Sequence, residues 1–247
     1  FWHRVNKMGA FSNKQLFSFS SYSNNKYSIG YGLSNIIYPS EIKDSFLQIG
    51  FIYKRINDYE LKIGRWKQEI TSESILSTGS LIRGNNSIPI PQISLMIPKY
   101  KKYIIFNNEI WIKGGFTHGW FSKGEYIKAP YLHEKYLYIK KHINDKSEFS
   151  LGLVHEAIWG GKTYIHGLQP GTFKDYFRVV FARPALSSGI IGEQVNVLGN
   201  HLGIWDISFS KKYLKQKIKF YYQHPFEDKS GAFQHFFDEL KKRKLTS

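Results

Sequence analysis

The chain has 247 residues, with 35 lysines and arginines against 19 aspartates and glutamates, and 17% of its residues are aromatic. It contains no cysteine, which excludes disulfide frameworks, thiolate zinc sites and thiol nucleophiles. No apolar run approaches the roughly 18–20 residues of a membrane-spanning helix, and the net charge of +16 is compatible with nucleic acid, anionic lipid or acidic polysaccharide as a partner.

Alternation of apolar and polar residues predicts antiparallel strands along most of the chain. The first are a hairpin over 15–23 and 26–34, followed by strands over 45–56 and 59–66. Within 45–56 the alternation predicts an apolar face made of Leu47, Ile49, Phe51 and Tyr53. Further strands are expected at 103–116, 131–142, 147–159, 201–210 and 214–224.

Many of these strands reach the roughly 9–11 residues that a tilted strand needs to cross a bilayer. Glycine and serine recur on their polar faces, which favours a crowded or water-filled lumen over an outer solvent surface. Aromatic residues lie near strand ends, as an interfacial girdle requires: Tyr22, Tyr38, Tyr100, Tyr131, Trp159 and Tyr213.

Two segments interrupt the strand pattern with helical spacing. TFKDYFRVVFARP has Thr172 as an expected N-cap and Pro184 beyond its end, and SGAFQHFFDELKKRK carries Phe233, Phe236, Phe237 and Leu240 on one stripe. We expect both to pack on the protein. Segments 71–92 and 172–183 are expected to fill the lumen.

The sequence nominates no catalytic group. It has no HExxH, GxSxG, GxGxxG or phosphate-binding loop motif, and His155 and Glu156 are adjacent strand residues that point to opposite faces. We therefore expect no enzyme activity, no metal site and no cofactor. The aromatic residues alternate along long strands and form no compact stacking platform, so nucleic acid is not an expected partner.

Six phrases of the sequence resemble the Wzi-type capsule assembly family, in its Bacteroidetes-like branch. They occur in the order expected for the family and together cover most of residues 60–231: LKIGRWKQEI, STGSLIRGNNSIPIPQISLMIP, YLHEKYLYIKK, FSLGLVHEAIWGG, LGNHLGIWDISF and FYYQHPFEDKSG.

The resemblance implies an all-β fold, a transmembrane antiparallel β-barrel of roughly eighteen strands with short inserted helices. It also implies a non-enzymatic role in the bacterial outer membrane, where the protein would bind exported capsular polysaccharide and anchor it to the cell surface. Residues 1–247 are then expected to be a single but partial barrel domain, because the chain shows no leader and ends in KKRKLTS where a closing strand is expected.

In this interpretation the partners are the polysaccharide and outer-membrane lipid. The apolar faces meet lipid, including Trp205, Ile207, Phe209, Ile218, Phe220 and Tyr222. The polar faces line a wet lumen, including Asp206, Ser208, Lys217, Lys219 and Gln223.

Aromatic platforms combined with planar polar groups are typical of glycan sites. We select as candidate glycan contacts Arg65, Trp111, Trp120, Glu156, Asn200, Asp206 and Glu227, each of which could instead be a lumen salt bridge or a girdle aromatic. Two other functions remain open: an outer-membrane solute channel, and a soluble β-sandwich enzyme acting on polysaccharide.

Overall fold

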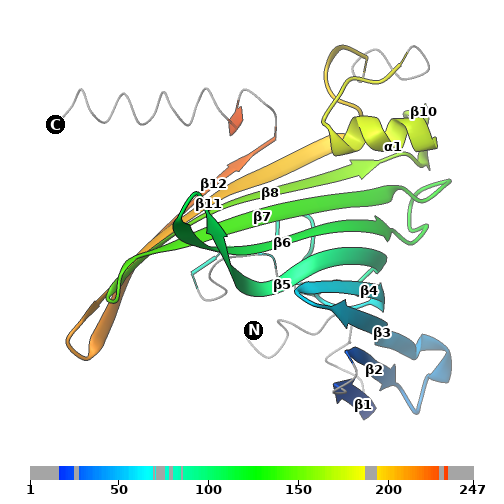
Figure 1. Ribbon diagram of the computed structural model, residues 1–247. Helices are drawn as coiled ribbons and strands as arrows, with labels where there is room; N and C mark the ends of the chain where they lie inside the picture. Colours follow the sequence, from blue (N-terminus) through cyan, green and yellow to red (C-terminus); the bar gives the residue numbers. More distant parts are fainter. Residues whose placement is uncertain are drawn as a thin grey trace.

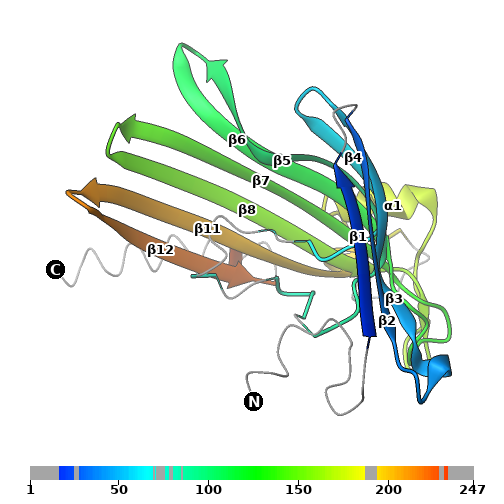
Figure 2. The same cartoon turned by 90° about the horizontal axis from the view of Figure 1, so that it is seen from below.

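The computed structural model describes residues 17–24, 28–68, 70, 76–77, 80–84, 86–186, 194–227 and 231–232. Its main feature is one curved, ten-stranded antiparallel sheet in which each strand pairs with its predecessor in the order β1-β2-β3-β4-β5-β6-β7-β8-β11-β12 (Figures 1 and 2). The strands are β1 (Phe17–Asn24), β2 (Ile29–Ile37), β3 (Phe46–Ile56), β4 (Tyr59–Arg65), β5 (Pro91–Ile105), β6 (Asn108–Trp120), β7 (Tyr131–Asn144), β8 (Ser147–Trp159), β11 (Asn200–Tyr213) and β12 (Gln216–Phe226). The all-β antiparallel prediction is confirmed. Among the described residues, β1 and β12 remain the two open ends of this order.

The connections differ in length at the two ends of the sheet. One end has two-residue turns, at 57–58, 106–107, 145–146 and 214–215. The other end carries the longer connections 38–45, 66–90, 121–130 and 160–199. The last of these contains the short hairpin β9 (Lys162–Thr163) and β10 (Gly167–Leu168) and the helix α1 (Phe173–Val180), and connection 38–45 contains the 3₁₀ turn η2 (Ile42–Asp44).

The two faces of the sheet differ in polarity. We call the face on which the described part of segment 66–90 lies the concave face, and the face that carries α1 the convex face. The concave face buries polar side chains, among them Gln92, Ser94, Thr117, Glu134, Ser150, Glu156, Asp206 and Ser208. The convex face exposes large apolar ones, among them Leu33, Ile63, Leu95, Leu137, Leu151, Phe220 and Tyr222. This is the reverse of the pattern of a water-soluble sheet.

The face assignments made from alternation are confirmed in β2, β4, β8, β11 and β12, where burial alternates with the expected parity. The assignment for 45–56 is wrong. Ser34 pairs with Ile49 whereas Asn35 pairs with Leu47, so Gln48 is an extra residue in β3. Such a bulge reverses the parity of the following residues. Tyr53 is consequently buried on the concave face and Ile52 is exposed on the convex face.

The expected strand 103–116 is two strands, because the chain turns at Phe106 and Asn107 between β5 and β6. Both residues have positive φ, 48° and 60°, as a two-residue hairpin turn that matches the strand twist requires. Residues 103–108 read YIIFNN, so the alternation is already interrupted there, and the Asn pair was a turn signal that the prediction passed over. β5 begins at Pro91, inside the end of the segment expected to be a loop.

Helix α1 confirms the first predicted helix, and its start is fixed by a capping box. The Thr172 side chain accepts from the Asp175 backbone N–H, and the Asp175 carboxylate accepts from the Thr172 backbone N–H at 2.8 Å. On the sheet side of α1, Val179 packs with Ala157 and Trp159 of β8, and burial raises the pKa of the Tyr176 hydroxyl. No helix in the described part of the chain is long and apolar enough to cross a membrane.

The expectation that 172–183 fills the lumen is wrong, because α1 packs on convex-face residues. Tyr176 contacts Phe116, His133 and Trp159, all of which point away from the concave face. The second predicted helix lies outside the described residues except for its first part at 231–232.

Candidate functional site

A group of tyrosines and lysines lies on the concave face, between segment 66–90 and the two-residue turns. We call Tyr100, Lys113, Tyr138, Lys140 and Asp206 the tyrosine–lysine cluster. The Lys140 ammonium lies 4.3 Å from the Tyr100 ring centroid, and the Lys113 ammonium lies 4.8 Å from that of Tyr138. Both contacts are cation–π interactions, which hold the ammonium groups over flat aromatic surfaces.

Asp206 anchors this cluster through two tyrosine hydroxyls. Its Oδ2 accepts from Tyr138 at 2.9 Å and from Tyr221 at 3.1 Å, and the side chain is 0% exposed. Tyr138 can reach Asp206 because the residue between them on β8 is Gly152, which pairs with both. A Cβ on Gly152 would lie 2.2 Å from the Tyr138 ring. Position 152 therefore requires glycine because the Tyr138 ring lies across it. This explains the glycine more specifically than general crowding of a lumen does.

The cations extend from the cluster toward β12. Lys217 donates to Glu148 Oε1 at 2.8 Å, Ser210 donates to the same oxygen at 2.9 Å, and Lys140 lies 3.9 Å from Glu148 Oε2. Tyr100 shares a hydrogen bond of 3.0 Å with Ser150. Tyr138, Ser150, Asp206 and Ser210 are buried, so the accessible part of this surface consists of the Lys113, Lys140 and Lys217 ammonium groups and the partly exposed Tyr100 ring. Such a surface can bind a negatively charged ligand.

Segment 66–90 borders the cluster and is tied to the concave face by buried polar contacts. Arg83 pairs with Glu134, with Nη2–Oε2 at 3.0 Å and Nε–Oε2 at 3.1 Å. Ser80 donates to Glu156 Oε1 at 2.8 Å, and Glu156 lies directly opposite Glu134 in the β7–β8 register. Gln92 donates to the Trp66 carbonyl at 3.3 Å. The described part of this segment therefore occupies the concave side, as expected for an inserted element.

Four of the seven candidate glycan contacts lie on the concave face, and two of these are at the cluster. Asp206 is its anchor, and Trp111 pairs with Lys140 in the β6–β7 register. Glu156 is enclosed by its contact with Ser80. Asn200 is exposed at the opposite end of the sheet, where β11 begins.

The other three candidates lie away from the cluster. Arg65 shares the convex side of β4 with Leu61 and Ile63, and its Nη1 donates to the Leu47 carbonyl at 3.0 Å. Trp120 is on the convex side of β6, against His118. Glu227 is exposed just after β12.

Sequence reasoning missed Tyr100, Lys113, Tyr138 and Lys140. Tyr100 was assigned to a girdle, but it points to the concave face, where its hydroxyl shares a hydrogen bond with Ser150 and its position has the same parity as Gln92 and Ser94 of β5. Tyr138 and Lys140 share the polar face of 131–142, so the alternation could have found them. Their meeting with Tyr100 depends on strand register, which the sequence does not specify.

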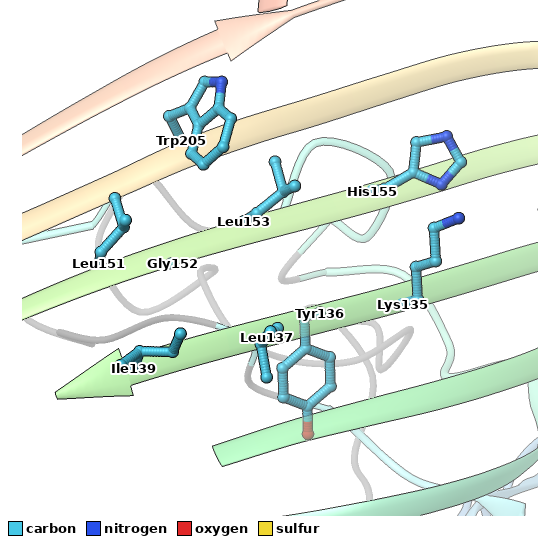
Figure 3. A pocket seen from close by; sticks show the side chains of 9 residues that line it. All are labelled: Lys135, Tyr136, Leu137, Ile139, Leu151, Gly152, Leu153, His155 and Trp205. Atoms are coloured by element: carbon cyan, nitrogen blue, oxygen red, sulfur yellow. The ribbon is translucent and has the colours of Figure 1, made fainter. Parts of the chain in front are cut away.

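The convex face carries a shallow apolar groove of about 350 Å³. Figure 3 shows Leu137 and Ile139 of β7, Leu151 and Leu153 of β8, and Trp205 of β11 around it, with Lys135 and His155 toward one end. Side chains of this kind fit an acyl chain and offer little to a sugar.

Histidines gather on the convex face, and one of them, His133, contacts Tyr176 of α1. His155 and His201 share a hydrogen bond of 2.8 Å, and His201 also contacts the Leu198 carbonyl at 2.8 Å. His133 is buried beside them, 6.0 Å from His155 between ring centroids. Within the described ranges, no group of three or more His, Cys, Asp or Glu residues is arranged to hold a metal ion.

Models of known protein families, curated proteins and solved structures were all compared with this chain, and none gives a match.

Proposed function

We propose that this chain is part of an outer-membrane β-barrel that binds an acidic surface polysaccharide on its concave, lumen-facing side and performs no catalysis. The observation that carries the proposal is the reversed polarity of the sheet: charged and hydroxyl side chains are buried on the concave face, and large apolar side chains are exposed on the convex face. A lipid-facing exterior and a wet lumen require this arrangement.

We propose further that the barrel is of the Wzi type, with roughly eighteen strands of which these ten are a part. The sheet is antiparallel, each strand pairs with its neighbour in sequence, and one end has two-residue turns, which is the plan of such barrels. Among the described residues β1 and β12 each have a single strand neighbour, and hydrocarbon does not tolerate unpaired strand edges, so a barrel of this kind requires both edges to be paired with further strands.

The tyrosine–lysine cluster supports polysaccharide as the ligand. The partly exposed Tyr100 ring can stack on a sugar, and the ammonium groups of Lys113 and Lys140 can pair with carboxylates or phosphates. Tyr138 is buried beneath them and hydrogen-bonded to Asp206, which supports this surface from below. With a net charge of +16, the chain also attracts anionic polymers over longer range. The described part of segment 66–90 narrows the concave side, which favours retention of a ligand over free conduction of solutes.

The soluble β-sandwich alternative requires the apolar faces of two sheets to meet in a core. Across the part of the chain that the structure describes, the convex apolar face meets no second large sheet. The exposed side chains of this face are therefore available to lipid.

The test is retention of an acidic capsular polysaccharide by the detergent-purified full-length protein. Lys140→Gln removes one ammonium of the cluster and is expected to weaken retention by about tenfold, the effect of losing one charge-assisted contact. Lys141→Gln is the matched control, because it makes the same change at the next residue, which points to the convex side.

Wild-type retention should fall as salt is raised, because the contacts are ionic and partly exposed. Equal retention by the Lys140→Gln and Lys141→Gln variants would refute the cluster as the binding site. Failure of the unsubstituted protein to retain an acidic polysaccharide better than a neutral one would refute the function.

A further inference from the structure

We propose that α1 and the β9–β10 hairpin form an interfacial anchor, which inserts aromatic side chains among the headgroups of the surrounding membrane and contacts lipid phosphates through basic ones. This inference rests on the proposed membrane location and adds a lipid-contact surface to it. It concerns the convex face, away from the tyrosine–lysine cluster.

The first observation is an aromatic stripe on the outer side of α1. Phe173, Phe177 and Phe181 recur every four residues and are 76%, 48% and 64% exposed, while Val179 and Val180 beneath them are buried. The Phe173 and Phe177 rings contact each other edge to face, with centroids 5.0 Å apart. The inner apolar side of α1 packs on the sheet. Its outer apolar side has no such contact with the sheet, and a lipid interface would bury it.

The second observation is the charge of this surface. Asp175 is buried in the capping box, so the charged side chains that α1 and its end expose or partly expose are basic: Lys174, Arg178 and Arg183. The Arg183 guanidinium lies 5.8 Å from the Phe181 ring centroid, which places a cation at the aromatic stripe itself. Aromatic and basic side chains on one helix surface are typical of binding to an anionic lipid interface.

The third observation is the level of α1 along the strands. Trp120, Tyr131 and Trp159 pair across β6, β7 and β8 at one end of the convex face, and Tyr176 of α1 packs on Trp159. A row of aromatic residues at strand ends marks the boundary between lipid and water. The helix therefore lies where headgroups are expected, independently of its own composition.

The neighbouring hairpin continues the apolar surface. Tyr164 and Ile165 at its turn are among the most exposed side chains of the described chain, and Leu168 follows on β10. Figure 1 shows β10 beside α1 at the same end of the sheet. Exposing three apolar side chains to water at one tip is unfavourable in free energy, whereas an interfacial location buries them in the membrane.

The convex groove leads from α1 into the apolar belt. Lys135, at one end of the groove, donates through its ammonium to the Val180 carbonyl at the end of α1. From there the groove passes along Leu137 and Leu153. A lipid whose headgroup meets α1 can thus place an acyl chain in the groove. The helix also covers His133, whose polar ring would otherwise face hydrocarbon.

The absence of native cysteine allows a direct test with single labelled cysteines in the full-length protein, reconstituted into phosphatidylcholine vesicles with and without phosphatidylglycerol. An environment-sensitive fluorophore is attached at Phe177→Cys or, independently, at Phe173→Cys. Leu137→Cys reports the apolar belt, and Lys215→Cys reports the water-exposed turn between β11 and β12. Lipids brominated near the headgroup or near the chain end act as quenchers.

The labels at residues 173 and 177 are expected to emit at shorter wavelength than the label at residue 215. They should be quenched most by headgroup-proximal bromine, and more strongly when phosphatidylglycerol is present. Emission and quenching equal to those at residue 215 would overturn the anchor, and indifference to phosphatidylglycerol would overturn the role of the basic residues. If the residue 137 label also behaves as water-exposed, the proposed membrane location itself fails, so the two failures are distinguishable.

Discussion

Replacing Arg83 with methionine is expected to lower the free energy of unfolding by about 3–5 kcal/mol, the cost of leaving one partner of a buried ion pair alone. Arg83 is the cation that pairs with Glu134, whose side chain is 0% exposed, and Glu156 lies directly opposite. Without the guanidinium, Glu134 keeps its desolvation cost and loses its compensating charge. Equilibrium unfolding in urea from lipid vesicles measures the change.

Two further variants separate this cause from others. Adding Glu134→Leu to Arg83→Met should restore most of the lost stability, because it removes the uncompensated carboxylate. Lys102→Met breaks a pair with Glu109 in which both side chains are about half exposed and screened by solvent, and it should destabilise the protein far less than Arg83→Met does. If Arg83→Met costs no more than Lys102→Met, segment 66–90 is not held as the structure indicates.

Leu137→Arg is expected to destabilise the membrane-inserted protein by about 2–4 kcal/mol, the cost of an arginine near the middle of a lipid-facing barrel surface. Leu137 is 49% exposed on the convex side of β7, so a water-soluble sheet would accept the substitution almost without cost. The same unfolding measurement in vesicles gives the change.

The matched control lies on the same strand, at the register irregularity next to its last residue. Ile143 is 58% exposed, beyond Lys141 near the two-residue turn, where the belt has ended. Ile143→Arg should cost only about 0–1 kcal/mol, as substitutions near the interface do. Equal effects of the two arginines would contradict a lipid boundary between these positions.

The strand-rich fold and most of the face assignments could be predicted because side chains alternate between the two faces of a strand. In β4, β8 and β11 apolar and polar residues follow this alternation over the whole strand. The sequence could not predict Gln48 as an extra residue in β3. A bulge depends on how two strands pair, and the alternation on either side of it looks regular. The face on which Tyr53 lies was predicted wrongly for that reason.

Two of the residues selected as candidate glycan contacts lie at the tyrosine–lysine cluster. Asp206 and Trp111 were selected for their chemistry, and strand parity places both on the concave face. Lys140 and Tyr100 form their contact through the register of β5, β6 and β7, which is a property of the folded sheet. Arg65 was selected for its chemistry alone, and its position at the convex end of β4 follows from the strand parity that Leu61 and Ile63 already showed.

The placement of α1 shows the limit of pattern reasoning. Its cap, length and apolar stripe could be predicted from Thr172 onward, yet the stripe is compatible with packing on either side of a sheet. The convex side was decided by tertiary contacts of Tyr176 with Phe116 and Trp159. A second stripe, Phe173 with Phe177, has the same helical spacing as Tyr176 with Val180, so the spacing alone does not separate the two.

The central claim is that the apolar side chains of this sheet are solvated by hydrocarbon, and one strand is enough to examine it. Fluorophores on single cysteines at Ser150, Leu151, Leu153 and Val154 of β8, in vesicles containing chain-brominated lipid, should be quenched at residues 151 and 153 and spared at residues 150 and 154. Quenching that does not alternate, or labels at residues 151 and 153 that are freely reached by a water-soluble quencher, would contradict it.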